Sequence, residues 1–269
     1  MDSNEPWPKS LSSVNRKVML LTTTGIVLHT TNYSESSVVS RIFTRQLGVR
    51  SYIIKGVRSA RGRHKQNLLQ PMCYIDMTVY ENQRQQLQHV KELHPSQQWL
   101  SIPLDMVKTS IVFFMGEVLY KVLREEEANV SLFDFVVSQL QLLDEVDSHV
   151  TGLGSWPVLF LLKLSRFVGI EPMDNYAAGS VLFNLKEGCF LPESTLVDDS
   201  VTSQFFLDEA SSLALHGYCA SLRDPSLEPP LISSEIRARL LKDLVEYYKV
   251  HFPNFRSLKS YEVLHAILR

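Results

Sequence analysis

A chain of 269 residues, of which 45% are hydrophobic, is long enough to bury a substantial core in one or two domains. Its three cysteines lie far apart and include no C-x-x-C pair, which excludes a disulfide framework and a cysteine zinc site. The net charge of −2 hides an asymmetry, because residues 1–100 carry 13 basic and 6 acidic side chains whereas the remainder carries 14 and 23. This asymmetry predicts that the basic part binds an acidic ligand and that the acidic part has a structural or partner-binding role.

Residues 1–18 contain no apolar stretch of the length found in signal peptides, so we expect a disordered lead-in there. Elsewhere the longest apolar run is far too short to cross a bilayer. Together with the unpaired cysteines, these features predict a protein of the reducing cytoplasm that has no membrane part.

Residues 19–96 show short alternating segments separated by turn residues, which is the pattern of strands. In the clearest segment Ile75, Met77 and Val79 fall on one face, and Asp76 and Thr78 fall on the other. Five strands in about 75 residues predict a small barrel. The expected strands are Gly25–His29, Ser37–Thr44, Val49–Val57, Met72–Tyr80 and Leu87–Leu93.

Residues 97–269 change to apolar spacings of three and four, which predict helices with one buried face. The first helix is expected between Leu104 and Glu126, and a second is expected to begin at Ser131, with Asp134 completing a capping box. Further helices are expected at about 155–169, 202–222, 233–250 and 257–268, with an irregular loop at 170–200 that holds a hairpin near Gly188. The predicted fold class is α+β, a five-stranded barrel followed by an all-helical domain.

The segment from Ser36 to Ile75 carries eight cations and no acidic residue. Cations without local counter-charges repel one another, and a polyphosphate backbone would relieve this repulsion while releasing its own condensed counterions. Gly56 and Gly62 would allow the backbone to approach a ligand closely or to move. The alternatives are an ordinary solvated loop and, for the cations on strands, a face turned away from the ligand. The candidate nucleic-acid contacts are Arg41, Arg45, Arg50, Lys55, Arg58, Arg61, Arg63 and Lys65.

Aromatic side chains near this basic stretch could provide platforms on which bases stack. The candidates are Tyr33, Phe43, Tyr52 and Tyr74, with Tyr52 and Tyr74 preferred as nucleic-acid contacts. Packing inside the barrel is the better explanation for Phe43.

Three motifs in order, GIVLHTTNYSESSVVSRIFTRQLG at 25–48, KGVR at 55–58 and LLQP at 68–71, resemble the amino-terminal domain of the RecO family of bacterial recombinational repair mediators. A weaker likeness continues through GEVLYKVL at 116–123, so that the resemblance covers about residues 19–269. It implies an OB-fold barrel and then a helical domain. It also implies a protein that binds single- and double-stranded DNA, anneals complementary strands, contacts the acidic tail of single-stranded-DNA-binding protein, and acts with RecR to help load RecA.

Some members of this family hold a structural zinc ion with four cysteines after the central helix. The comparable stretch of this chain offers only Cys189, so we expect no metal there. Hydrophobic contacts would have to hold this loop instead, from Val181, Leu182, Phe183, Phe190 and Leu191.

Two pairs of cations stand at i, i+3 spacing on expected helices, Lys121 with Arg124 and Lys163 with Arg166. Apolar residues stand beside them, among which we name Phe114, Tyr120 and Phe160. A groove that combines cations with apolar walls would suit the acidic tail peptide that the resemblance implies. The alternative is an ordinary amphipathic helix with solvated basic residues.

The sequence carries no motif of a catalytic or cofactor site. Neither G-x-S-x-G, G-x-x-x-x-G-K-[ST] nor G-x-G-x-x-G is present, and His89 and His94 around Glu92 lack the spacing of H-E-x-x-H. We therefore expect no enzyme, cofactor or metal. Two other classes stay open: a general RNA-binding barrel protein and a metal-dependent enzyme that processes nucleic acid.

Overall fold

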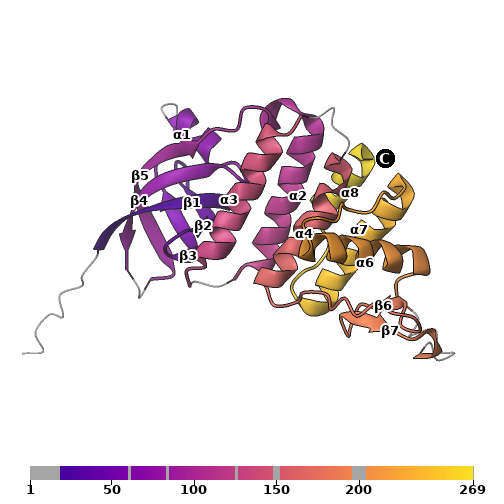
Figure 1. The fold of residues 1–269 in the computed structure, drawn as a ribbon. Helices are drawn as coiled ribbons and strands as arrows, with labels where there is room; N and C mark the ends of the chain where they lie inside the picture. The colour runs from indigo at the N-terminus through magenta and orange to yellow at the C-terminus, as the bar shows by residue number, and fades with distance from the viewer. Residues whose placement is uncertain are drawn as a thin grey trace, which may run out of the picture.

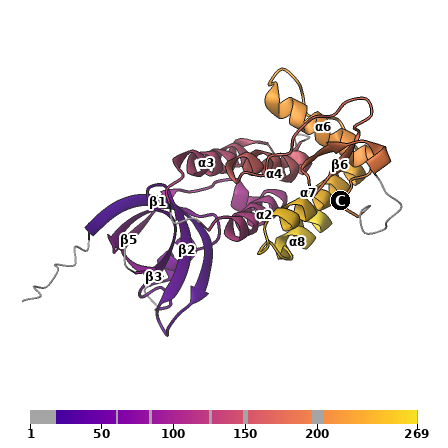
Figure 2. The same cartoon turned by 90° about the horizontal axis from the view of Figure 1, so that it is seen from below.

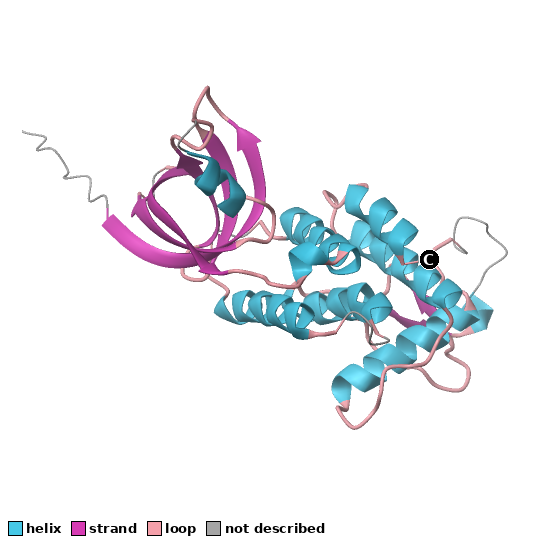
Figure 3. Cartoon of the chain, turned by 90° about the horizontal axis from the view of Figure 1, so that it is seen from above, coloured by secondary structure: helices cyan, strands magenta, loops and turns pink. Residues whose placement is uncertain are grey.

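The computed structural model describes residues 19–59, 62–82, 85–124, 127–147, 152–195 and 204–268. A barrel of strands occupies one side of the molecule and a group of helices the other (Figures 1 and 3). This confirms the predicted α+β class and the order of its two parts along the chain. The expected lead-in at residues 1–18 lies outside the described residues.

Five strands form the barrel, in the spatial order β1-β2-β3-β5-β4. It closes because β4 also pairs with β1, and every pair is antiparallel except β3 with β5. A short helix, α1, connects β3 to β4. This is the OB-fold that the resemblance implied. The elements are β1 Met19–Asn32, β2 Val38–Thr44, β3 Gly48–Ile54, α1 Arg63–Leu68, β4 Tyr74–Glu81 and β5 Leu87–Gln97.

The alternation in β4 places side chains as expected, since Ile75, Met77 and Val79 are buried inside the barrel. The expected end of β3 at Val57 is wrong, because the strand stops at Ile54 before Gly56 turns the chain with a φ of +72°. Helix α1 was not expected, because it contains no buried residue and so leaves no hydrophobic pattern.

The second part of the chain consists mostly of helices, with one short hairpin. The helices are α2 Met106–Val122, α3 Val130–Glu145, α4 Trp156–Phe167, α6 Glu209–Arg223, α7 Ser234–His251 and α8 Lys259–Ile267. The hairpin is β6 Leu182–Asn184 with β7 Cys189–Leu191, and single 3-10 turns lie at η2 Ile102–Leu104, η3 Leu153–Ser155 and η4 Glu193–Thr195. None of the helices that the structure describes is both long and apolar enough to span a membrane.

The caps and first residues predicted for the helices are confirmed in part. Gly169 follows α4 with a φ of +76°, and Ser233 accepts the N–H of Ile236 at the start of α7, as expected. The expected capping box at Ser131 is wrong, because the side chain of Asn129 caps α3 by accepting the N–H of Leu132. The helix expected from about residue 202 begins later, behind Asp208.

Helices α2 and α3 lie directly against the outer wall of the barrel, and α4, α6, α7 and α8 lie beyond them (Figure 2). The wall contributes Ile26, Leu28 and Phe43 to the same core as the helices. The ring centroid of Phe43 lies 5.3 Å from that of Phe133 on α3. The interior of the barrel has a separate core. The outer face of β2 is therefore an internal seam of the protein.

The irregular segment after α4, where the resemblance raised the question of zinc, is packed by hydrophobic side chains. Phe183 and Phe190 are buried, and their ring centroids lie 5.2 Å apart in an edge-on arrangement. Tyr247 of α7 packs on Phe183 and donates a hydrogen bond to the carbonyl of Ile170 at 2.9 Å. The expected hydrophobic contacts are thus present at the centre of the loop, whereas Leu182 and Leu191 are only partly buried.

Candidate nucleic-acid interface

The cations of the basic stretch separate into two groups in the structure. Three of them, Arg41, Arg45 and Arg50, contact other parts of the protein. Four others, Lys55, Arg58, Arg63 and Lys65, lie at the rim of the barrel, between the end of β3 and α1. Arg61 lies outside the residues that the structure describes.

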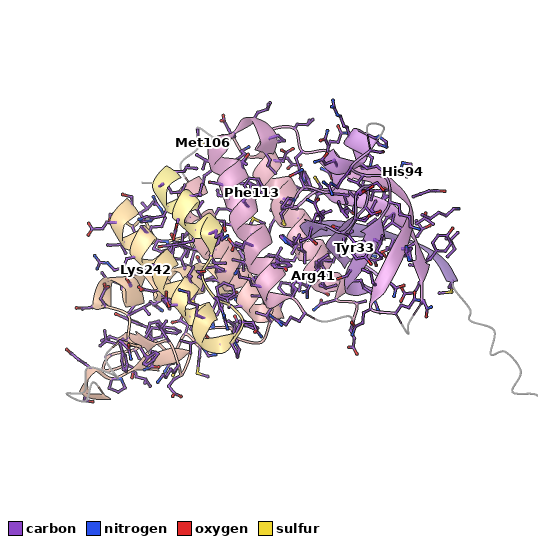
Figure 4. The ribbon with its side chains drawn as sticks, turned by 180° about the vertical axis from the view of Figure 1, so that it is seen from behind. Tyr33, Arg41, His94, Met106, Phe113 and Lys242 are labelled. Carbon is purple, nitrogen blue, oxygen red and sulfur yellow. The ribbon has the colours of Figure 1, made fainter. Side chains whose placement is uncertain are left out.

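Arg41 joins β2 to the end of α2. Its Nη2 donates to the carbonyl oxygen of Leu123 at 2.9 Å, and its guanidinium carbon lies 5.6 Å from the ring centroid of Tyr120. Burial lowers the pKa of Arg41. Figure 4 shows Arg41 on the side of the barrel that faces the helices. In this structure Arg41 does not present its charge to a ligand, which corrects its assignment as a nucleic-acid contact.

Arg45 and Arg50 also have partners within the protein, which argues against their assignment as nucleic-acid contacts. Arg45, in the turn between β2 and β3, forms a two-pronged ion pair with Asp134 of α3. The largely buried side chain of Arg50 donates to the carbonyl of Leu47 at 3.3 Å and lies 3.7 Å from a carboxylate oxygen of Glu81. Both charges are balanced within the protein.

The rim cations have a different environment. The side chains of Lys55, Arg58 and Arg63 are exposed and that of Lys65 is half-buried. Within the described part of the chain, no ion pair neutralises Lys55, Arg63 or Lys65. Arg58 donates from Nη1 to the carbonyl of Ser34 at 2.9 Å, and its backbone N–H donates to the carbonyl of Ser36 at 3.2 Å. These bonds hold the loop between β1 and β2, residues 33–37, against the basic segment.

Two glycines shape this rim. Gly56 has a φ of +72° with open space around it, which favours a residue without a Cβ. At Gly62 a Cβ would lie 1.9 Å from the carbonyl oxygen of Gly56 and 2.5 Å from that of Val57. Only glycine can approach so closely, and this approach brings the chain just before Arg63 against the backbone of Gly56 and Val57. This close approach is made to the chain itself, so the expected approach to a ligand stays a prediction.

The aromatic candidates are mostly buried. Tyr52 is fully buried inside the barrel and cannot stack on a base, which corrects that assignment. Tyr74 is half-buried, with ring centroids of Trp99 at 6.5 Å and of Phe133 at 6.0 Å. Phe43 is buried in the core, in agreement with the packing role preferred for it over base stacking. Tyr33, in the loop that Arg58 holds, is 61% exposed (Figure 4).

We call Tyr33, Lys55, Arg58, Arg63 and Lys65 the basic edge. It combines an exposed ring with cations that have no acid of their own at ion-pair distance. The loop between strands 1 and 2 is one of those through which OB-folds bind oligonucleotides. The outer face of β2, which OB-folds also use, is covered here by α2 and α3. The candidate nucleic-acid contacts with exposed cations, Lys55, Arg58 and Arg63, therefore lie at the rim of the barrel.

The two cation pairs of the helical part do not form one groove. Arg124, Lys163 and Arg166 line three separate hollows of about 270, 410 and 300 Å³, which share no residue. Lys121 lies 3.6 Å from Glu117, and Arg166 lies 2.7 Å from Glu171. Phe114 and Phe160 are fully buried in the core, so their assignment to a peptide groove is corrected. Tyr120 packs on His29 and Arg41 at the seam.

One of these hollows keeps the expected combination of a cation with apolar walls. Lys163 is half-buried between α3 and α4, beside Leu142, Trp156 and Leu159. Burial, with a further contribution from Arg166, lowers the pKa of Lys163. Among the residues described, no group of three His, Cys, Asp or Glu side chains is placed to hold a metal ion.

Comparison with known proteins gives consistent matches along the chain. A family model described as recombination protein O N terminal matches residues 19–99, and one described as recombination protein O C terminal matches residues 103–178. The DNA repair protein RecO of Phocaeicola vulgatus is 32% identical over 247 residues, which cover 91% of this chain and 98% of that protein. The proteins of the same name from Porphyromonas gingivalis W83 and Christiangramia forsetii are 28% and 26% identical, each covering 93% of this chain and 99% of the relative.

Proposed function

Because the chain belongs to the RecO family of DNA repair proteins, we propose that its basic edge binds single- and double-stranded DNA without sequence preference. The observation that carries this proposal is the set of cations without ion pairs at one rim of the barrel, where Arg58 also bonds to the loop that holds the exposed ring of Tyr33. Contacts to phosphates release condensed counterions, and an exposed ring offers a surface for any base. Both interactions are independent of sequence.

Strand annealing follows from the same charge. Two complementary strands that share the basic edge repel each other less than they do in water, and base pairing then supplies the specificity. In this proposal the protein is a mediator and not an enzyme. It acts in the cytoplasm and, together with RecR, helps to load RecA on DNA covered by single-stranded-DNA-binding protein.

For the acidic tail of single-stranded-DNA-binding protein, we propose the hollow between α3 and α4. Lys163 supplies a partly desolvated charge there, and Trp156 and Leu159 supply apolar walls. A cation of this kind attracts a carboxylate more strongly than a fully hydrated one. Lys163→Glu is expected to weaken binding of a labelled tail peptide, and Lys249→Glu, a charge reversal on α7, is the matched control.

The experiment for DNA binding is fluorescence anisotropy of a labelled single strand across a salt series. Wild type is compared with a variant in which Arg58, Arg61, Arg63 and Lys65 are all changed to glutamate. A variant with Lys91, Lys186, Arg256 and Lys259 changed to glutamate carries the same net charge and controls for it. About five phosphate contacts give a logarithmic salt slope of about −3.5, from roughly −0.7 per phosphate. We call the variant of Arg58, Arg61, Arg63 and Lys65 the basic-edge variant. We expect the affinity for DNA and the magnitude of the salt slope to fall in this variant and not in the control.

Unchanged affinity and slope in that variant would remove the basic edge from the binding site. A labelled RNA strand of the same sequence is measured in parallel, and a marked preference for it would favour the general RNA-binding class. Annealing is followed without ATP or metal, where no acceleration over protein-free strands would count against the mediator role.

A further inference from the structure

A second basic site lies far from the barrel, in a hollow between α7 and α8. Its volume is about 570 Å³, within the range of small-molecule sites. Lys242 on its wall stands on the side of the helices away from the barrel (Figure 4). Gly154 of the turn η3 forms its floor, and Tyr261 and His265 of α8 form another wall.

Two cations in this hollow are not neutralised, although the helical part has an excess of acid. Arg239 and Glu235 also line the hollow, where they lie 3.3 Å apart, and Arg239 binds Asp208 at 2.6 Å as well. Arg237 and Lys242 form no ion pair with any acid in the described part of the chain. Two uncompensated charges that face one hollow favour an anionic ligand.

Arg237 packs on the backbone of the turn η3. A Cβ on Gly154 would lie 2.9 Å from Nε, 3.0 Å from Cζ and 3.0 Å from Nη2 of Arg237. The guanidinium group therefore lies directly on Gly154, and any larger residue there would displace it.

The other wall is aromatic. Tyr261 and His265, one turn apart on α8, have ring centroids 5.8 Å apart and planes only 19° from parallel. Leu241 of α7 and Leu268, which follows α8, add apolar lining to the hollow. Ring faces next to apolar groups are surfaces on which a nucleobase stacks.

We propose that this hollow binds a nucleotide, with its phosphate at Arg237 and Lys242 and its base against Tyr261 and His265. The aromatic wall distinguishes this ligand from a simple anion, and the size of the hollow suits a single nucleotide. The ligand comes either from free nucleotide or from the phosphorylated end of a DNA strand. The site is separate from the basic edge and does not depend on it.

The test begins with calorimetric titration of thymidine 5′-monophosphate into the full chain at low salt. Thymidine, which lacks the phosphate, and inorganic phosphate, which lacks the nucleoside, are titrated in the same way. Each is expected to bind at least about ten-fold more weakly than the mononucleotide. Arg237→Glu and Lys242→Glu are each expected to weaken the mononucleotide by about ten-fold or more, because each removes a charged contact to the phosphate. Lys249→Glu, on the same helix but outside the hollow, is expected to bind like wild type.

A second variant keeps every charge and so separates displacement from misfolding. Gly154→Ala moves the guanidinium group of Arg237 without removing it, and the backbone at residue 154 is not in the left-handed region. We expect a native melting temperature and weaker binding. Arg237→Gln, which removes the charge without reversing it, is measured beside it. If both Gly154→Ala and Arg237→Gln bind the mononucleotide as tightly as wild type, Arg237 has no role in this site.

The two sources are separated by competition between 5′-phosphorylated and 5′-hydroxyl oligothymidylate. If the strand end is the ligand, the phosphorylated form binds more tightly and Arg237→Glu removes the difference. The basic-edge variant keeps both the mononucleotide and the end preference, so failure of one proposal is distinguishable from failure of the other. If neither mononucleotide binding nor end preference depends on Arg237 or Lys242, the proposal is wrong.

Discussion

Arg45 and Asp134, 89 residues apart, join the barrel to α3 through two hydrogen bonds, from Nε to Oδ1 at 2.9 Å and from Nη2 to Oδ2 at 3.0 Å. The bonds from Arg45 lower the pKa of Asp134. Both side chains are about half exposed, and ion pairs of this kind contribute little to stability. Their role is to fix the orientation of the turn between β2 and β3 relative to the helices.

We therefore expect Arg45→Ala to change DNA affinity by less than about two-fold, because its charge is already neutralised in the free protein. Arg58→Ala and Arg63→Ala should each weaken binding and reduce the salt slope by about 0.7. Anisotropy titrations at several salt concentrations measure both. A loss in Arg45→Ala equal to that in Arg63→Ala would mean that the pair with Asp134 opens when DNA binds.

Tyr33→Ala should weaken single-strand binding by about 1–3 kcal/mol if one base stacks on this ring. The salt slope should stay the same, because no phosphate contact is removed. Tyr80→Ala is the matched control, since Tyr80 is also an exposed ring of the barrel, at 41%, but lies outside the basic edge. Equal losses in the two variants would argue against a stacking site at Tyr33.

Gly62→Ala should disturb the rim without changing any charge. The new Cβ would meet two backbone carbonyl oxygens, at 1.9 and 2.5 Å, so the chain before α1 must shift. We expect faster amide exchange in residues 55–68 and weaker DNA binding. Gly217→Ala controls for the substitution, since its Cβ would meet only the side chain of Pro230 at 3.0 Å. Native DNA affinity in Gly62→Ala would show that the position of Arg63 is unimportant.

Lys108→Met should destabilise the protein. Lys108 is buried, and its ammonium group donates to Ser101 Oγ at 2.7 Å and to the carbonyl of Asp144 at 3.2 Å, where α3 ends. The ammonium group also donates to the carbonyl of Val146 at 2.5 Å. Methionine fills the space but removes this donor from the buried acceptors, which costs about 1–3 kcal/mol of unfolding free energy. Urea unfolding measures the loss, and Lys91→Met at an exposed site should cause almost none.

Asp243→Asn should stabilise the protein at neutral pH. Burial raises the pKa of Asp243 to about 6, and the nearby charge of Asp208 adds to this effect. The ordinary aspartate pKa of about 3.9 applies in the unfolded chain, so between about pH 4 and 6 the folded state binds more protons and stability falls as the pH rises. The variant should gain most over wild type above pH 6, and the gain should shrink toward pH 4. Urea unfolding at pH 4, 5, 6 and 7.5 tests this, and a constant difference would contradict it.

Local patterns were sufficient for most elements of the fold. The alternation of Ile75, Met77 and Val79 predicts a strand with one face in the barrel, and the spacing of Ile111, Phe114 and Val118 predicts the buried face of α2. Glycine and serine signals at Gly169, Gly188 and Ser233 also predicted their turn and cap correctly, because each depends on a few neighbouring atoms.

The site depended on contacts between distant segments. The sequence alone determined that cations gather between Ser36 and Ile75 and that acidic residues are absent there. Only the tertiary structure decided that Arg41 and Arg45 face the helices while Arg58 and Arg63 face outward. The physical reason is that Arg41 and Arg45 find partners in the helical part, 82 and 89 residues away, whereas Arg58 bonds to the neighbouring loop and its side chain stays exposed.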